Sequence, residues 1–514
     1  LSSKDNTPDP EILKFTNLVN PDLDIDFKKE KYVELKNDNE KFKYVLLLIC
    51  KKLGRVIPQV FDGITDYIDI LIPDNLLNDT GFITKIINDV PQENYNQVEI
   101  IGWLYQYYNQ TEKDRVMAEK KAYKKNEIPY ATQLFTPDWI VKYMVENSLG
   151  RFWIEHNRDE ILCPSDDLYD SSSITNNWKY FIKENIENKQ GKIKPTEITF
   201  IDPCCGSGHV LVYAFEVFYQ IYLKSGFNKK DISELILKNN LYGLDIDDRA
   251  GQLSILSVLL KAREYDNNLF NREICHKINI ASIAESNNIN SDLVINELTE
   301  QSSNDCKYLL EKFYDAKEKG ALIKLDIKNY TTLKEELKNK NTIFLIDFKE
   351  KIKPILKVAE ILQEKYTIVV TNPPYMGNSF LSNNMKKFLA DEYKEGKSDL
   401  CTAFMQIDLL KDNGYYAIIN QQVWMFTVLY ENLRNWFLNN RNLTTMIHLG
   451  TRAFEEISGE VVSTTAFVMD KNINRNKETS FFRFVEIKDA RKKENEFITN
   501  KNKYKFDLNI NKIK

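Results

Sequence analysis

The sequence has little of what a metal site or a disulfide framework requires. Of its 514 residues only 4 are histidines, and the 7 cysteines are odd in number and scattered along the chain. No CxxC, HxxH or HExxH spacing occurs, so the pattern indicates no structural zinc. Unpaired cysteines suit a reducing compartment better than a secreted, disulfide-linked scaffold. We therefore expect no bound metal.

Long apolar runs are absent as well. The longest, residues 44–50, has seven residues, whereas a bilayer-spanning helix needs roughly 18 or more. The first residues lack the apolar stretch and small-residue cleavage site of a secretory signal. With 17 Gly and 14 Pro, the composition also excludes a collagen-like chain. We expect a cytoplasmic protein without a membrane partner.

The residues that are present indicate a folded chain of two to four domains. Hydrophobic residues make up 43% and aromatic residues 12% of the sequence, which is enough for large buried cores. The net charge is -5, but residues 471–514 hold 13 Lys and Arg against 6 Asp and Glu. This asymmetry fits either a nucleic-acid contact at that end or a solvated lysine-rich tail.

The pattern of apolar residues divides the chain into three parts. Residues 1–125 have apolar residues at helical spacing and predict a helical N-terminal domain. Residues 126–471 alternate short apolar strands with helices, which predicts an α/β domain with a Rossmann-like, doubly wound, mostly parallel sheet. Residues 472–514 form a basic C-terminal segment. The strands are expected at 198–202, 241–245, 367–371, 415–420 and 446–449, with 461–469 as an antiparallel partner.

Two polar, asparagine-rich stretches interrupt the α/β domain. They lie near residues 157–195 and 285–345 and show only weak periodicity. We expect them to be insertions outside the core.

A glycine-containing turn follows the first predicted strand. The sequence Asp202-Pro-Cys-Cys-Gly-Ser-Gly208 leads into a helix expected from about Val210 to Leu223. Glycines allow close approach of a ligand, and a helix N-terminus offers free N–H groups. The turn is neither a Walker loop nor a GxGxxG motif. It predicts a cofactor seat, and we interpret Cys204 and Cys205 as packing residues.

The second strand of this nucleotide-binding half ends in two aspartates. Asp245 stands at the strand end, where a carboxylate can accept both hydroxyls of a ribose. Asp247 is better placed to cap the helix that begins near Arg249.

The most specific motif is Asn372-Pro-Pro-Tyr375, which follows an apolar strand. Two prolines fix a rigid bend at the carboxyl end of the sheet, where open α/β folds bind ligands. The lone pair of an adenine or amide nitrogen is delocalised, so the nitrogen is a poor nucleophile. Hydrogen bonds to Asn372 Oδ1 and the Pro373 carbonyl would favour a nucleophilic state, while Tyr375 would stack on the base beside a cationic methyl donor.

Taken in order, six motifs carry a resemblance to a known family. They are Gln133-Leu-Phe-Thr-Pro137, Asp202-Pro-Cys-Cys-Gly-Ser-Gly208, Leu244-Asp-Ile-Asp247, Asn372-Pro-Pro-Tyr375, Ser398-Asp-Leu-Cys401 and Asn413-Gly-Tyr-Tyr416. The order resembles the gamma class of S-adenosylmethionine-dependent DNA adenine-N6 methyltransferases. With residues 100–108 and 131–150, the chain is most similar to the PglX-type methyltransferases of bacteriophage-exclusion (BREX) defence, over roughly residues 95–470.

The resemblance implies a class I methyltransferase fold, S-adenosylmethionine as cofactor, and double-stranded DNA with a flipped adenine as partner. It also implies a place in a restriction-modification-like defence system, with other subunits of such a complex as possible partners. The implied catalytic residues are Asn372, Pro373, Pro374 and Tyr375. The implied cofactor-binding residues are Phe135, Thr136, Pro137, Asp202, Cys204, Gly206, Gly208, Asp245, Ile246, Ser282, Asn372, Asp399 and Phe404.

The sequence departs from this family in two places. The acidic residue usual after the third strand is not evident, and residues 279–285 offer only Ser282 or Glu285 for the cofactor adenine. PglX-type chains are also about twice as long, with a target-recognition region after the catalytic fold. We expect a truncated product, a fragment, or one half of a split protein.

Two other functions remain open at this point. Asn-Pro-Pro-Tyr chemistry also serves protein glutamine-N5 methylation, although such enzymes are shorter and lack the upstream Phe-Thr-Pro segment. A non-catalytic subunit that binds DNA or a defence complex is the second alternative. Trp424, after the strand that ends at Asn420, fits either a target-base pocket or the core.

Overall fold

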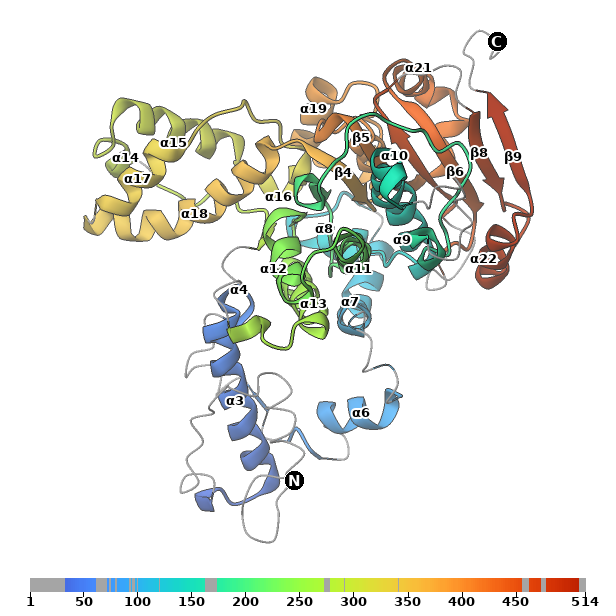
Figure 1. The fold of residues 1–514 in the computed structure, drawn as a ribbon. Helices are drawn as coiled ribbons and strands as arrows, with labels where there is room; N and C mark the ends of the chain where they lie inside the picture. The colour runs from blue at the N-terminus through green and yellow to red at the C-terminus, as the bar shows by residue number, and fades with distance from the viewer. Residues whose placement is uncertain are drawn as a thin grey trace.

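A single large sheet organises the computed structural model of this chain (Figure 1). The structure describes residues 33–61, 72–161, 173–271, 278–454, 462–472 and 478–507, except for 74, 79–80, 92–93, 95–97, 99, 120, 291 and 341. Within these residues the sheet has nine strands in the order β3-β2-β1-β4-β5-β7-β6-β8-β9. The strands are β1 (Phe200–Asp202), β2 (Leu241–Asp245), β3 (Asn279–Ser282), β4 (Tyr366–Thr371), β5 (Leu410–Gln421), β6 (Asn442–Gly450), β7 (Thr464–Asp470), β8 (Glu478–Arg483) and β9 (Lys503–Asp507).

The strand directions match the prediction. Strands β3, β2, β1, β4 and β5 are parallel, and β7 is antiparallel to both β5 and β6. The antiparallel partner expected near 461–469 is therefore β7. The predicted Rossmann-like, doubly wound, mostly parallel sheet is confirmed.

Both faces of the sheet are buried, as the short apolar strands predict. In β1, Phe200 packs into one apolar cluster and Ile201 into the other. Neighbouring strands repeat this alternation: Ile368 and Val369 in β4 face opposite clusters, and so do Tyr415 and Tyr416 in β5.

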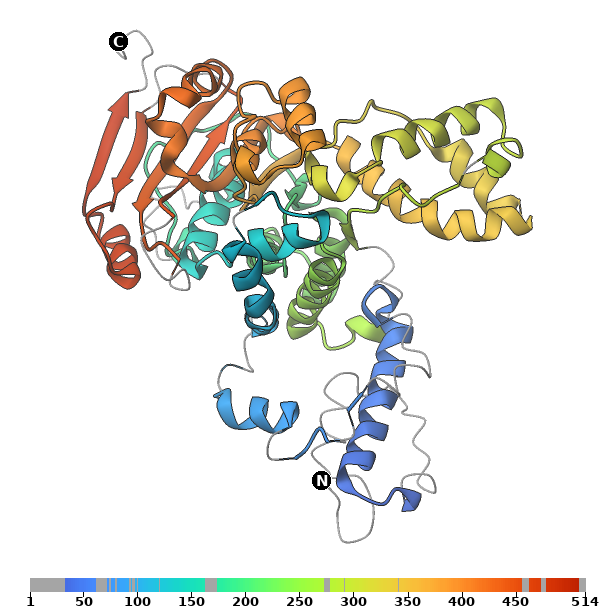
Figure 2. The same cartoon turned by 180° about the vertical axis from the view of Figure 1, so that it is seen from behind.

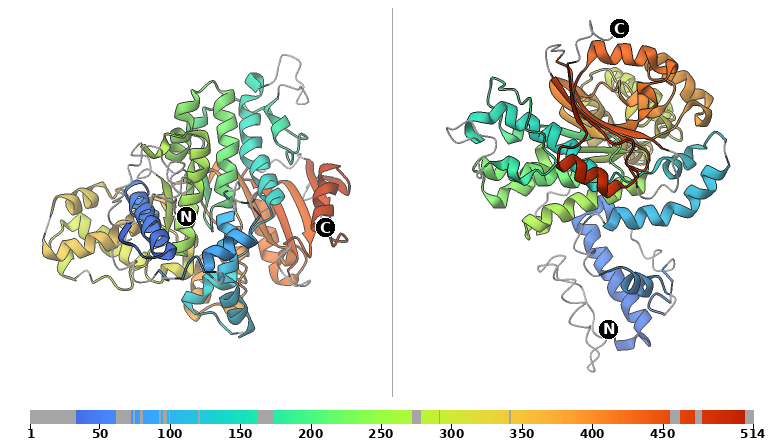
Figure 3. Two further views of the ribbon diagram at one scale, coloured as in Figure 1. Left: turned by 90° about the horizontal axis from the view of Figure 1, so that it is seen from below. Right: turned by 90° about the vertical axis from the view of Figure 1, so that its right-hand side faces the viewer.

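Helices cover each face. One face carries α9 (Asp138–Val145), α10 (Arg151–Ile161), α11 (His209–Lys224), α12 (Lys229–Asn239) and α13 (Asp248–Tyr265), and the other carries α18 (Ile343–Gln363), α20 (Leu400–Phe404) and α21 (Glu431–Asn440). This two-sided cover is visible when the molecule is seen along its right-hand side (Figure 3). Asp247 accepts a hydrogen bond from the Arg249 N–H at 3.0 Å, so it caps α13 as predicted.

The first polar stretch differs from its expectation. Residues 174–182 include Ile174, Trp178 and Phe181, which are buried in the main apolar cluster. Their backbone is held by Arg151, whose guanidinium donates to the carbonyls of Ile182 and Asn185. A buried cation thus satisfies carbonyls that the irregular backbone leaves unpaired, and residues 174–182 belong to the core although the stretch is polar; its residues 162–172 lie outside the described part of the chain.

The second polar stretch forms a helical lobe between β3 and β4. It contains α14 (Asp292–Ile295), α15 (Glu300–Lys312), α16 (Ala316–Lys319), α17 (Thr331–Asn339) and the start of α18, and it projects from one side of the sheet (Figures 1 and 2). Leu309, Leu333 and Leu337 are buried within it. Its apolar residues are sparse but spaced for helices, so the lobe has an apolar layer of its own.

The N-terminal part is helical where it is described. It contains α3 (Asp38–Val56), α4 (Pro58–Phe61), α6 (Phe82–Asp89), α7 (Ile100–Ala118) and α8 (Ile128–Thr132). At the other end, β8, α22 (Ala490–Ile498) and β9 extend the sheet. The predicted boundary near 125 falls between α7 and α8, which line one pocket, as shown below. The predicted boundary near 471 falls between β7 and β8, which belong to one sheet. In the part of the chain that is described, no helix is both long enough and apolar enough to span a bilayer.

Candidate active site

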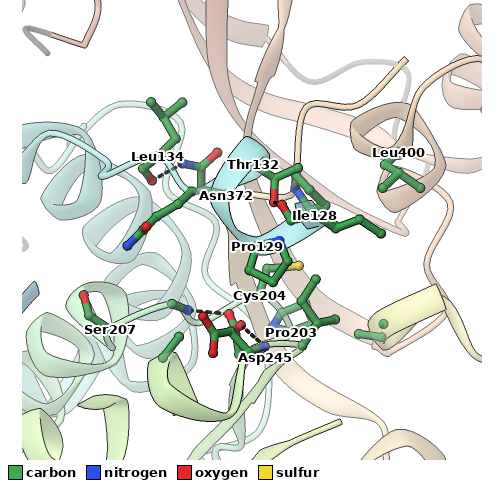
Figure 4. Close-up of a pocket in the computed structure, with 18 of the residues that line it drawn as sticks. Ile128, Pro129, Thr132, Leu134, Pro203, Cys204, Ser207, Asp245, Asn372 and Leu400 are labelled. Carbon is green, nitrogen blue, oxygen red and sulfur yellow. Dashed lines mark hydrogen bonds between the residues drawn. The ribbon is translucent and has the colours of Figure 1, made fainter. Parts of the chain in front are cut away.

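A pocket opens at the carboxyl ends of β1, β2 and β4 (Figure 4). Its empty space is about 970 Å³, including the open mouth. The sequence-predicted residues that line it are Phe135, Cys204, Gly206, Asp245, Ile246, Asn372, Pro374 and Phe404. The predicted residues that lie outside its lining are Thr136, Pro137, Asp202, Gly208, Ser282, Pro373, Tyr375 and Asp399. The glycine turn and the Asn-Pro-Pro-Tyr motif therefore border the same cavity.

The glycine turn supplies one wall. Gly206 has φ +52°, and a Cβ built on it would meet no atom within 4 Å, so this backbone faces open space. Its N–H donates to Asp245 Oδ2 at 2.8 Å. The turn leads directly into the N-terminus of α11, whose dipole adds positive potential. Backbone, dipole and open space together form a cradle that fits the polar part of a nucleoside-containing cofactor.

Asp245 is fixed at the end of β2 by two backbone donors. It accepts from the N–H groups of Gly206 and Asp247, each at 2.8 Å. Burial raises the pKa of Asp245 to about 6. The carboxylate is thus mostly ionised at neutral pH, and it lines the pocket as an acceptor for hydroxyl groups.

Asp202 lies behind the pocket lining, whereas Asp245 is part of it. Its Oδ1 accepts from the Cys204 N–H at 3.0 Å, and burial raises its pKa to about 7. Because it does not reach the pocket lining, its observed role is to shape the turn after β1. Gly208 is also outside the lining: at φ +92° it begins α11 and packs against Ser254 of α13.

The amide of Asn372 is oriented by the segment before α9. Its Nδ2 donates to Thr136 Oγ1 at 3.0 Å and to the Leu134 carbonyl at 3.3 Å. Its Oδ1 is buried and has no hydrogen-bond partner. Figure 4 shows the amide beside Leu134. An unpaired buried acceptor is costly, so this oxygen fits a donor that arrives with a ligand.

Asp399 holds the backbone that directly follows the Asn-Pro-Pro-Tyr motif. Asp399 caps α20, and its Oδ1 accepts from the N–H groups of Met376 at 3.2 Å and Cys401 at 3.0 Å. The same short helix places Phe404 in the pocket wall. The Tyr375 hydroxyl is buried without a partner, and burial holds its pKa well above the usual range. Asp399 therefore positions the motif without lining the pocket.

Phe135 is held by aromatic contacts. Its ring stacks on His209 with centroids 4.5 Å apart and meets the edge of Trp103 at 6.2 Å. Gly102 of α7 makes this approach possible, because a Cβ there would lie 2.5 Å from Ser207 Oγ and 3.0 Å from the Phe135 ring. Trp424, by contrast, packs between Phe437 and Phe467 and is a core residue.

Reasoning from sequence missed three parts of the pocket wall. They are Gly102, Tyr105 and Gln106 of α7, Ile128, Pro129 and Thr132 of α8, and Glu318 to Leu322 of the helical lobe. Tyr105 donates through its hydroxyl to Asp247, which ties α7 to the end of β2. These residues are remote in sequence from the strand ends, and the one sequence signal was Gly102, a glycine in the first turn of α7.

Comparison with known proteins gives consistent matches. The family described as Eco57I restriction-modification methylase matches residues 239–454. The adenine-specific methyltransferase BrxX of Escherichia coli O9:H4 (strain HS) is 36% identical, covering 91% of this chain and 41% of that protein. The adenine-specific methyltransferase PglX of Lacticaseibacillus casei (strain Zhang) is 35% identical, covering 89% of this chain and 39% of that protein. A cryo-EM structure of a DrdV–DNA complex is 11% identical with a TM-score of 0.45, covering 97% of this chain and 42% of that one. The chain thus spans about two fifths of the length of the curated relatives it matches.

Proposed function

Because the chain is a homologue of the PglX and BrxX adenine-specific methyltransferases, we propose that it transfers a methyl group from S-adenosylmethionine to adenine N6 in DNA. We further propose that it acts site-specifically within a bacterial phage-defence system. The observation that carries the reaction is the buried, unpartnered Asn372 Oδ1 at the wall of a pocket that also contains Asp245 and Gly206.

The proposed chemistry follows from the missing hydrogen-bond donor at Asn372 Oδ1. The amine of adenine has two N–H donors, and its lone pair is delocalised into the ring. Asn372 Oδ1 accepts one of these hydrogens and the Pro373 carbonyl the other, which returns electron density to nitrogen. Since Thr136 and Leu134 already bind the amide nitrogen, the side chain cannot turn its donor toward the amine without breaking both bonds. Tyr375 stacks on the flipped base.

The chain's own residues would hold the cofactor around the glycine turn. S-adenosylmethionine, when bound, supplies an electrophilic methyl group on a cationic sulfur. Asp245 would accept the ribose hydroxyls, and Gly206 would leave room for the backbone to approach. Phe135, Cys204, Ile246 and Phe404 would provide the apolar walls, with Thr136, Pro137, Asp202 and Gly208 shaping the seat from behind.

The partners and the domain division are proposed on the same basis. Double-stranded DNA with an extruded adenine would approach the mouth of the pocket, and other defence subunits would contact the same assembly. We propose 1–125 as the N-terminal helical part, 126–471 as the part that carries the methyltransferase site and 472–514 as a basic end whose strands β8 and β9 complete the same sheet. In the curated relatives this portion makes up about two fifths of a longer protein.

The test is methyl transfer by the full chain. Purified protein is incubated with labelled S-adenosylmethionine and either unmethylated duplex DNA, the same duplex with its adenines already N6-methylated, or glutamine-containing protein. We expect label in the unmethylated duplex alone, recovered as N6-methyladenine. Label in protein glutamine would favour the N5 alternative, and cofactor binding without transfer to any DNA would favour a non-catalytic subunit.

A further inference from the structure

The wall of the pocket beside Ile246 comes from the helical lobe rather than from the third strand. Gly320, Ala321 and Leu322 line the pocket, and so does Ile246 at the end of β2. A Cβ built on Gly320 would lie 3.3 Å from Ile246 Cγ2. Gly320 therefore packs directly against Ile246, with no room for a side chain between them, and the two residues form one continuous apolar wall of the pocket whose position depends on where the lobe holds Gly320.

Ser282 and Glu285, the two residues at and after β3 that were expected to contact the cofactor adenine, make other contacts. Ser282 packs against α13, where a Cβ on Gly251 would lie 2.3 Å from its hydroxyl oxygen. Glu285 binds the lobe instead: its Oε1 accepts from the Lys317 N–H at 3.0 Å and lies 3.0 Å from Lys125 Nζ. Neither side chain lines the pocket.

A single lysine, Lys125, joins Glu285 after β3 to Asp315 of the helical lobe. Lys125 Nζ lies 2.7 Å from Asp315 Oδ1 as well as 3.0 Å from Glu285. Asp315 also exchanges two hydrogen bonds with Asn287, and it adopts φ +53° at the start of α16. The Lys125 ammonium holds the pKa of Asp315 below its ordinary value. Lys125 itself lies three residues before Ile128, which also lines the pocket.

We propose that the Lys125–Glu285–Asp315 cluster is a positioning device that sets the Gly320–Leu322 wall against Ile246, and that the adenine ring of the cofactor lies against this joint wall. The inference rests on the proposed function for the identity of the ligand. In this arrangement the lobe replaces the side chain that the third strand does not supply. Lys317 braces the same turn from its other side, through an ion pair of 2.7 Å to Asp248 at the start of α13.

The positioning role of the cluster predicts that replacing Lys125 weakens cofactor binding. Removing the lysine leaves two partly buried carboxylates facing each other, so the turn that carries Gly320 relaxes away from Ile246. Lys125→Met should raise the Kd of S-adenosylmethionine about fivefold to tenfold. Since Asn372 is untouched, kcat at saturating cofactor should stay within about twofold of the wild-type value.

The experiment is calorimetric titration of the full chain with S-adenosylmethionine and with 5′-methylthioadenosine, which shares the adenosyl part only. Lys125→Met should weaken both ligands by a similar factor, and Lys125→Arg should restore most of the affinity. Asp315→Asn, which keeps a residue tolerant of positive φ, should reproduce the loss without disturbing the fold. Lys121→Met, in the same segment but outside the cluster, is the matched control and should change nothing.

Four outcomes are informative in different ways. Unchanged affinity in both Lys125→Met and Asp315→Asn would overturn the positioning role, and so would weakened S-adenosylmethionine with unchanged methylthioadenosine. A wild-type chain that binds the cofactor but methylates no adenine would contradict the proposed reaction while leaving the assignment of the adenine wall supported. A wild-type chain that binds neither adenosyl ligand would overturn both.

Discussion

At the scale of single residues, the side chains at the pocket have separable roles. Asn372 presents an acceptor that no protein group satisfies, whereas Asp245 presents one that two backbone donors have already fixed in place. The Asn372 oxygen is suited to an amine whose N–H groups must be hydrogen-bonded during the reaction. The Asp245 carboxylate is suited to binding in the ground state. Mutations at these two positions should therefore affect different kinetic parameters.

Asn372→Ala should abolish most methyl transfer while leaving the cofactor in place. Removing the acceptor leaves the amine delocalised, so we expect turnover to fall by about 100-fold or more. The Kd of S-adenosylmethionine should stay within about threefold, because Asp245 and Gly206 are unaltered. Single-turnover kinetics and calorimetry measure the two quantities. Joint loss of transfer and binding would contradict the assigned role.

Cofactor affinity should fall as the pH is lowered through about 6. Burial raises the pKa of Asp245 to about 6, and only its carboxylate form accepts both ribose hydroxyls. Below that pH, protons compete with the ligand, so the Kd should rise by up to about tenfold per pH unit. Titrations between pH 5 and pH 8 test this. Asp245→Asn should bind weakly throughout this range and show no such slope.

At the scale of elements, two neighbouring glycines of the same turn separate binding from folding. Gly206 faces open pocket, while a Cβ on Gly208 would lie 2.8 Å from Ser254 Oγ and 3.0 Å from Ser254 Cα. Both have positive φ, which costs any substituted residue about 1 kcal/mol. Only Gly208 adds a clash between α11 and α13.

Gly208→Ala should therefore destabilise the fold by about 2 to 3 kcal/mol, seen as a lower unfolding temperature. Gly206→Ala is its matched partner, with a smaller loss of stability but a larger rise in the Kd of S-adenosylmethionine, because the new methyl group enters the pocket. Denaturant melts and calorimetry on the two variants provide the comparison. Equal effects of both substitutions on both measurements would refute this division.

At the scale of the whole molecule, the basic end of the chain is structural over the described residues 478–507. Strand β8 pairs with β6, and Phe482 and Phe497 are buried in the main apolar cluster. Lys493 is fully buried, with its ammonium donating to the carbonyls of Leu449 and Thr451. Positive charge in this region is therefore partly committed to holding the end of β6.

A chain ended at residue 471 should be markedly less stable than the full chain. It loses β8, α22 and β9, exposes the edge of β6, and leaves apolar residues of the main cluster in contact with water. We expect a lower unfolding temperature and aggregation on heating, measured by differential scanning calorimetry and light scattering. Unchanged stability would instead support the reading of this segment as a solvated tail.

Much of this molecule followed from local pattern. Strands buried on both faces appear as short apolar runs, so β1, β2, β4, β5, β6 and β7 were placed within a few residues of their observed bounds. The antiparallel direction of β7 followed from the lack of a long helix between it and β6. The core role of residues 174–182 was missed, because their burial depends on Arg151 satisfying backbone carbonyls, an interaction that local composition does not reveal.

The sequence alone determined most strands of the sheet, the glycine turn and the proline-fixed corner, because strand periodicity, positive φ and proline geometry are set by residues adjacent in the chain. Strands β8 and β9 were not predicted, because they lie in the segment expected only as a basic end. Only the tertiary structure decided how the pocket is closed. Its remaining walls come from α7, α8 and the helical lobe, which meet through contacts such as Tyr105 with Asp247 and Lys125 with Asp315. These pairs are separated by 142 and 190 residues, and such proximity follows from packing rather than from pattern.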